Sequence, residues 1–88
     1  MQQDNQTLPE QWAECVRIMN ENPQVTGRGR GNIAVCEPRG LMGTTLLMAV
    51  PSEVTREFLQ HRPMSEVLDA TVSQVFGEDT LVAVSYTH

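Results

Sequence analysis

Apolar residues recur with a helical period over residues 8–20 and again over residues 53–76. The first stripe falls at spacings i, i+4, i+8 and i+11, which puts its members on one helical face: Leu8, Trp12, Val16 and Met19. Thr7 followed by Glu10 has the form of a capping box, in which each side chain satisfies the other residue's backbone N–H. The pattern predicts a helix from Leu8 to about Asn20, ended by Asn22-Pro23.

A second signal is an apolar strand that runs directly into a helix. Residues 44–50 are apolar at nearly every position after Thr45, which predicts a strand that is covered on both faces or at least has a central place in a sheet. Pro51 cannot donate to a sheet and ends the strand, and Ser52 is a good helix N-cap. The helix is expected to reach about residue 61, with its apolar face formed by Val54, Phe58 and Leu59.

The C-terminal third is predicted to be helical and then extended. Pro63 either kinks the preceding helix or begins a second helical segment. The helical pattern continues to about Val75, and Gly77 suits the position after a helix end. The final strand is expected over Thr80 to Tyr86.

Residues 26–43 carry weaker signals. Glycine at positions 27, 29 and 31 disfavours a helix by about 2–3 kcal/mol relative to alanine. We therefore expect a frayed helix or a loop that becomes helical only towards residues 33–35 and ends before Pro38. A short strand over 39–42 and a turn at Gly43 follow, and we interpret Gly40-Leu41-Met42-Gly43 as part of a hairpin.

The predicted order is α, α, β, β, kinked α, β. This order corresponds to one α+β domain in which helices cover a three-stranded sheet, an arrangement like that of K-homology domains. We place the domain at residues 8–86 and a disordered N-terminal tail at residues 1–7.

The strand-proline-helix run over residues 46–59 resembles the N-terminal domain of DnaA, the family of bacterial chromosomal replication initiators. The likeness continues through Val67, Leu68 and Val72 to the apolar residues 81–84. Upstream, residues 11–16 resemble the first helix of that family, which typically opens with a tryptophan. The resemblance covers roughly residues 8–86 and implies the same fold.

The resemblance also implies site residues. In that family the tryptophan of the first helix belongs to a self-association surface, which here falls on Trp12 with Leu8 and Val16 of the same stripe. From the sequence pattern alone Trp12 is either a core residue or a partner anchor; we expect its indole to stay partly open to solvent. The ATPase and double-stranded DNA-binding domains would lie beyond His88, so ATP is expected there and no cofactor in this chain.

The family's residues that contact the replicative helicase are not matched by residues of the same type in this chain. The family's acidic residue before its second helix aligns with Thr26 or Gly27, neither of which is acidic. The family's aromatic residue at the start of the third helix aligns with Val54, which is a smaller side chain. From the sequence pattern alone, Val54 is also compatible with a place in the core. These departures change the pairing chemistry expected of a helicase contact.

Charge limits any contact with nucleic acid. The chain has six arginines, no lysine and a net charge of −5, whereas phosphate binders are usually basic. The alternation of glycine with Arg28 and Arg30 resembles an RGG-type segment, but no aromatic residue interleaves to stack on bases. The two arginines are either solvated surface residues or a weak contact for single-stranded DNA.

No pattern predicts catalysis. A phosphate loop needs a lysine, and the chain has none, so a phosphate loop is excluded. Cys15 and Cys36 do not have metal-ligand spacing, and we interpret both as small buried hydrophobic residues. We interpret His61 as an exposed helical histidine and expect neither a catalytic residue nor a metal site. The polar N-terminus is not a signal peptide, and the apolar run 46–50 is too short to span a bilayer, so we expect a cytoplasmic protein without a membrane partner.

The leading hypothesis is a non-enzymatic interaction domain of a replication initiator. Its expected partners are a second initiator molecule, the replicative helicase and regulators of initiation. One alternative is a K-homology-like module that binds single-stranded nucleic acid weakly. A second is a small regulatory domain of an unrelated cytoplasmic protein.

Overall fold

The computed structural model describes residues 7–86. In this part of the chain the elements follow one another as α1 (Leu8–Asn20), α2 (Gly27–Ala34), β1 (Glu37–Met42), β2 (Thr45–Val50), α3 (Glu53–Gln60), α4 (Met64–Phe76) and β3 (Leu81–Tyr86). The predicted α+β class is confirmed, and the order of elements matches the prediction except that two helices, α3 and α4, stand where one kinked helix was expected.

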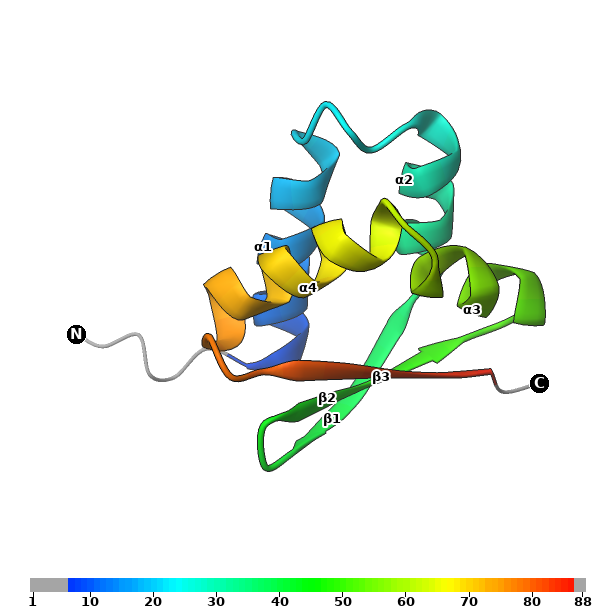
Figure 1. Ribbon diagram of the computed structural model, residues 1–88. Coiled ribbons are helices and arrows are strands. Elements are labelled where there is room, and N and C mark those ends of the chain that lie inside the picture. The colour runs from blue at the N-terminus through cyan, green and yellow to red at the C-terminus, as the bar shows by residue number, and fades with distance from the viewer. Residues whose placement is uncertain (1–6, 87–88) are drawn as a thin grey trace.

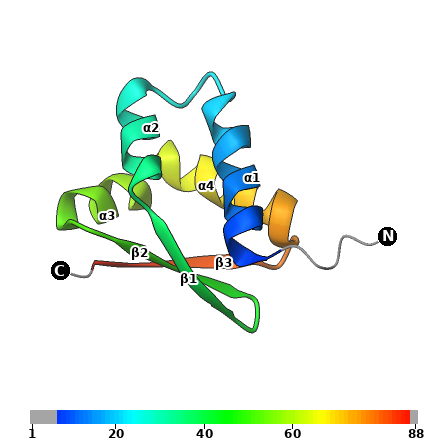
Figure 2. The same cartoon turned by 180° about the vertical axis from the view of Figure 1, so that it is seen from behind.

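The three strands form one mixed sheet in the order β1-β2-β3. β1 and β2 form an antiparallel hairpin with Gly43 at φ 62° in its turn, whereas β2 and β3 are parallel and are joined through α3 and α4. β2 is therefore the central strand, as its apolar sequence predicts. The helices gather on one side of the sheet (Figures 1 and 2).

The core lies between this helical layer and β2. Leu46, Met48 and Val50 occupy alternate positions of β2, so their side chains point to the same face of the sheet. Each of them is at most 2% exposed. The helices contribute most of the remaining core, including Cys15, Met19, Ile33, Leu59, Val67, Leu68 and Val72.

Side-chain caps set the starts of the helices. The Thr7 hydroxyl accepts the N–H of Glu10 at 3.3 Å, and the Glu10 carboxylate accepts the N–H of Thr7 at 2.9 Å, so the predicted capping box is present. The Ser52 hydroxyl accepts the N–H of Thr55 at 3.2 Å. Of the predicted N-terminal tail, residues 1–6 lie outside the described part of the chain, and residue 7 is the cap of α1.

The prediction of a frayed helix or loop at residues 27–32 is wrong. α2 is helical from its first glycine, since the Thr26 hydroxyl accepts the N–H of Gly29 and Ile33 is buried in the core. Gly29 also lies close to α4: a Cβ there would be 3.3 Å from the Met64 sulfur. Tertiary packing therefore offsets the low helix propensity of the three glycines.

The single kinked helix expected after Ser52 is two separate helices. α3 ends because His61 has an extended backbone, with φ −104° and ψ 152°. The Arg62–Pro63 peptide bond is cis, and α4 begins at Met64 directly after the proline. Of the two outcomes open at Pro63, a second segment is the one observed.

Candidate partner-binding surface

Two residues from separate helices meet beside the start of α2. The guanidinium carbon of Arg28 lies 5.4 Å from the centroid of the Phe58 ring on α3, which is within the range of a cation–π contact. Thr26 and Gly27 lie directly before Arg28 in the chain, at the N-cap and the first position of α2. The contact therefore joins the first turn of α2 to α3 through the Arg28 side chain.

Val54 extends the same region on α3. It precedes Phe58 by four residues, so the two side chains lie on neighbouring turns of one helical face. Val54 is 66% exposed, and Phe58 is half-buried against the core. We call the region formed by Thr26, Gly27, Arg28, Val54 and Phe58 the α2–α3 surface.

The buried face of α3 differs from the prediction. It is formed by Thr55 and Leu59, which are 6% and 1% exposed, and not by Val54. The possibility that Val54 is an ordinary core residue is therefore excluded. The sequence pattern placed Phe58 on one helical face with Val54, and this spacing is the signal that Phe58 also borders the exposed surface.

Trp12 lies in the core. Its side chain is 7% exposed, so the expectation that the indole stays partly open to solvent is wrong. Leu8 and Val16 are half-buried and pack against the same core cluster. The physical reason is that α4 packs against α1 and closes over its apolar stripe, so the stripe is an internal contact of the fold.

The two arginines of the glycine-arginine segment do not act together. Arg28 is engaged with Phe58, while Arg30 donates to the backbone oxygen of Asn20 at 3.3 Å. Because they are two residues apart on a helix, their side chains do not face each other. Gly40 to Gly43 lies in the β1–β2 hairpin, as predicted.

The titratable groups singled out in the sequence are dispersed. Cys15 and Cys36 are free thiols whose pKa values are raised by burial to about 11 and about 12. The Nδ1 atom of the exposed His61 lies 2.6 Å from the backbone oxygen of Glu57, the geometry of a ring N–H donating within its own helix turn. Within residues 7–86 no group of three or more metal-ligating side chains comes together.

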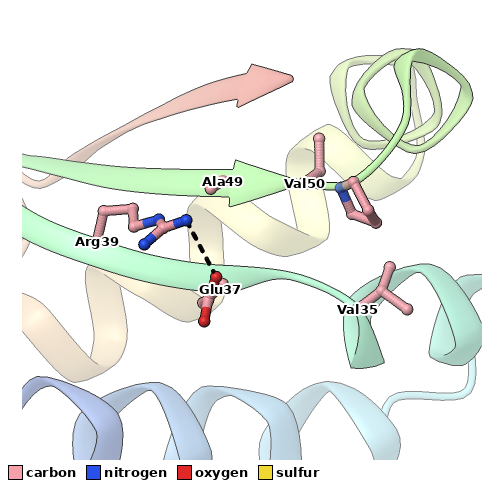
Figure 3. A pocket seen from close by; sticks show the side chains of 6 residues that line it. Val35, Glu37, Arg39, Ala49 and Val50 are labelled. Carbon is pink, nitrogen blue, oxygen red and sulfur yellow. Dashed lines mark ion pairs between the residues drawn. The ribbon is translucent and has the colours of Figure 1, made fainter. Parts of the chain in front are cut away.

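A shallow hollow of about 150 Å³ lies where β1 and β2 approach α2 (Figure 3). Its charged side chains are Glu37 and Arg39, which pair at 3.3 Å. Val35, Ala49, Val50 and Pro51 supply its apolar lining. Because the two charges neutralise each other, the hollow is a weak candidate for a charged ligand.

Comparison with known proteins shows a likeness to a replication initiator. No family model matches the chain. The chain is 30% identical over 59 residues to the chromosomal replication initiator protein DnaA of Clavibacter sepedonicus, and equally to that of Clavibacter michiganensis subsp. michiganensis (strain NCPPB 382). The match covers 67% of this chain and 12% of each relative. The chain is thus similar to a small region of DnaA.

The helices of residues 7–86 include none that combines the length and the apolar character needed to cross a bilayer.

Proposed function

We propose that this chain is the N-terminal interaction domain of a chromosomal replication initiator, corresponding to domain I of DnaA. In this proposal it acts in the cytoplasm by binding other proteins, and the ATPase and DNA-binding activities belong to other parts of the initiator. The similarity to DnaA and the K-homology-like order of elements support it. Because the match covers 12% of each relative, the activity of the whole initiator is part of the proposal.

The exposed α2–α3 surface carries the proposal. Val54 is an apolar residue that is 66% exposed, and it lies one helical turn before Phe58, whose ring contacts Arg28. Aromatic residues and arginine are enriched at the centres of protein interfaces. Two of the elements to which the resemblance assigns helicase contacts meet here, and the proposed partners are the replicative helicase and regulators of initiation.

Self-association needs a different account from the one expected. The buried Trp12 offers no anchor to a second molecule, and Leu8 and Val16 expose only part of their side chains. We therefore propose that self-association of the isolated domain is weak. Weak contacts become effective when several initiators are held on one DNA, because tethering raises their effective concentration.

The decisive experiment compares two exposed apolar positions. The chain is titrated against the replicative helicase encoded by the same genome, and the dissociation constant is measured by biolayer interferometry. Val54→Glu should weaken binding about tenfold or more, since it places a charge in an apolar contact. Met42→Glu is the matched control, because Met42 is 68% exposed but lies at the β1–β2 hairpin.

Circular dichroism and thermal unfolding verify that both variants stay folded. Equal affinity of a folded Val54→Glu variant and the unmodified chain would exclude the α2–α3 surface as the helicase contact. Equal weakening by Met42→Glu would show a general charge effect instead of a specific site.

A further inference from the structure

The two edge strands of the sheet, β1 and β3, differ in how well they are protected against pairing with a further strand. On the β1 edge, Pro38 lacks an N–H, the register shifts between Pro38 and Gly40, and Glu37 and Arg39 carry charges. These features obstruct the addition of another strand. The β3 edge, residues 81–86, contains no proline, glycine or charged residue. Its sequence favours pairing with a further strand.

A groove runs beside this unprotected edge. It measures about 180 Å³, and all of its lining residues come from β3, α3 and α4. Val82 and Val84 line it from alternate positions of β3, so they point to the same face of the sheet. Leu59 and Leu68 are buried at its base. Figure 1 shows α3 and α4 on one side of β3, which contacts both helices.

The groove has room for a side chain. A cavity of about 150 Å³ accommodates benzene, so a groove of this size admits one aliphatic side chain. A peptide strand paired with β3 would present alternate side chains on this face of the sheet, as its neighbours do. Within residues 7–86, β3 pairs only with β2, so the outer backbone edge of residues 81–85 lies beside this recess. The recess combines apolar lining residues with the polar Gln60, Ser65 and Asp69. A strand edge next to a side-chain recess is the arrangement that β-strand addition uses.

Charge defines the occupant further. Asp69 is the charged residue that lines the groove, and within residues 7–86 it forms no ion pair. Glu78 and Asp79 lie in the turn before β3, and the whole chain has a net charge of −5. This acidic setting favours a basic segment. It disfavours a second copy of the chain, which would bring the same carboxylates together.

We propose that the β3 edge binds an extended segment of a partner protein as an added strand. The segment places an aliphatic side chain in the groove and a lysine or arginine next to Asp69. This interaction uses none of the residues of the α2–α3 surface, so it can be tested independently of the proposed function.

The first test uses charge. The full chain is titrated by isothermal calorimetry with a synthetic decapeptide that alternates valine and threonine and carries two lysines, and with a counterpart carrying two glutamates. The lysine peptide should bind about tenfold more tightly. Asp69→Lys should remove this preference, whereas Glu37→Lys on the opposite edge strand makes the same charge change and should leave it intact. No binding of the lysine peptide, or equal effects of the two variants, would overturn the proposal.

The second test uses the peptide backbone and leaves the protein unchanged. Two further lysine peptides carry N-methyl groups on alternate amides, one on the odd and one on the even positions. Since only alternate N–H groups of a strand face its neighbour, one peptide should bind about tenfold more weakly than the other. Equal affinity of both methylated peptides would rule out strand addition. A dimer of the chain that the lysine peptide dissociates, seen by light scattering, would assign the edge to a second copy and also overturn the proposal.

Discussion

The guanidinium carbon of Arg28 lies 5.4 Å from the centroid of the Phe58 ring, and this contact ties α2 to α3. The two residues belong to helices separated in sequence by the whole β1–β2 hairpin. Arg28 is an exposed residue, so the contact is expected to contribute about 0.5–1 kcal/mol. It also joins the first turn of α2 to the helical face of α3 that carries the exposed Val54.

Arg28→Ala should lower the free energy of unfolding by about 0.5–1 kcal/mol, since the ring of Phe58 loses its cationic partner. Urea unfolding followed by circular dichroism measures the change. Arg30→Ala is the control and should have a smaller effect, because within residues 7–86 the side chain of Arg30 makes an exposed hydrogen bond to the backbone oxygen of Asn20 and no ion pair. A larger loss at Arg30 would contradict the assignment.

Trp12→Ala should destabilise the domain by about 3–5 kcal/mol, as expected for truncating a large buried aromatic side chain. Thermal unfolding detects a loss of this size readily, since domains of this length have modest total stability. A cost of about 1 kcal/mol or less would mean that the indole is not a core residue in solution.

Gly31→Ala should stabilise the domain by about 0.8–1 kcal/mol, because alanine has the higher helix propensity and a Cβ at this position meets no atom of the described residues beyond its own helix backbone within 4 Å. Gly29→Ala should stabilise the domain by less than Gly31→Ala does, or should destabilise it. Its Cβ would lie 3.1 Å from a methyl carbon of Val25 and 3.3 Å from the Met64 sulfur. Urea midpoints of the two variants provide the comparison, and equal gains would show that α2 is not packed closely here.

Stability should fall as the pH rises above about 8.5, the ordinary pKa of a thiol in an unfolded chain. Burial raises the pKa of Cys15 to about 11 and that of Cys36 to about 12, so the folded state keeps protons that the unfolded state releases. This contribution is complete below the unfolded pKa and is lost progressively as the pH rises towards the folded values. Urea midpoints between pH 8 and pH 10 measure the decline.

The variant with both Cys15→Ala and Cys36→Ala provides the control for this effect. It should have lower stability at neutral pH but a shallower decline at alkaline pH. An unchanged slope would show that other groups are responsible.

Single-stranded DNA should bind weakly, with a dissociation constant at or above about 10⁻⁴ M at physiological salt, the weak end of non-specific binding. The reason is the net charge of −5 together with the local engagement of Arg28 and Arg30. Fluorescence anisotropy over a series of salt concentrations measures both the affinity and its salt dependence. Micromolar binding with a steep salt slope would favour the K-homology-like nucleic-acid module over the interaction domain.

The local signals of the sequence determined most of the elements. The capping box at Thr7 and Glu10, the proline at the end of β2 and the Ser52 cap each act within a few residues, so their outcomes follow from sequence alone. The apolar sequence of β2 likewise indicated a central position, which the strand order β1-β2-β3 confirms.

The sequence determined only part of the candidate partner-binding surface. The family resemblance selected Thr26, Gly27 and Val54, and the structure shows how Arg28 and Phe58 bring their helices together. This contact depends on how α2 and α3 pack against the rest of the fold, which no spacing within either helix reveals.

Tertiary structure alone decided which apolar residues are covered. Periodicity places Trp12 and Val54 each on an apolar helical stripe, yet α4 closes over the first while the second stays 66% exposed. The same packing made a helix of the glycine-rich residues 27–31, where propensity favoured a loop. Burial depends on neighbours distant in sequence, whereas caps and chain breaks depend on adjacent residues, and this difference separates the predictions that were confirmed from those that were wrong.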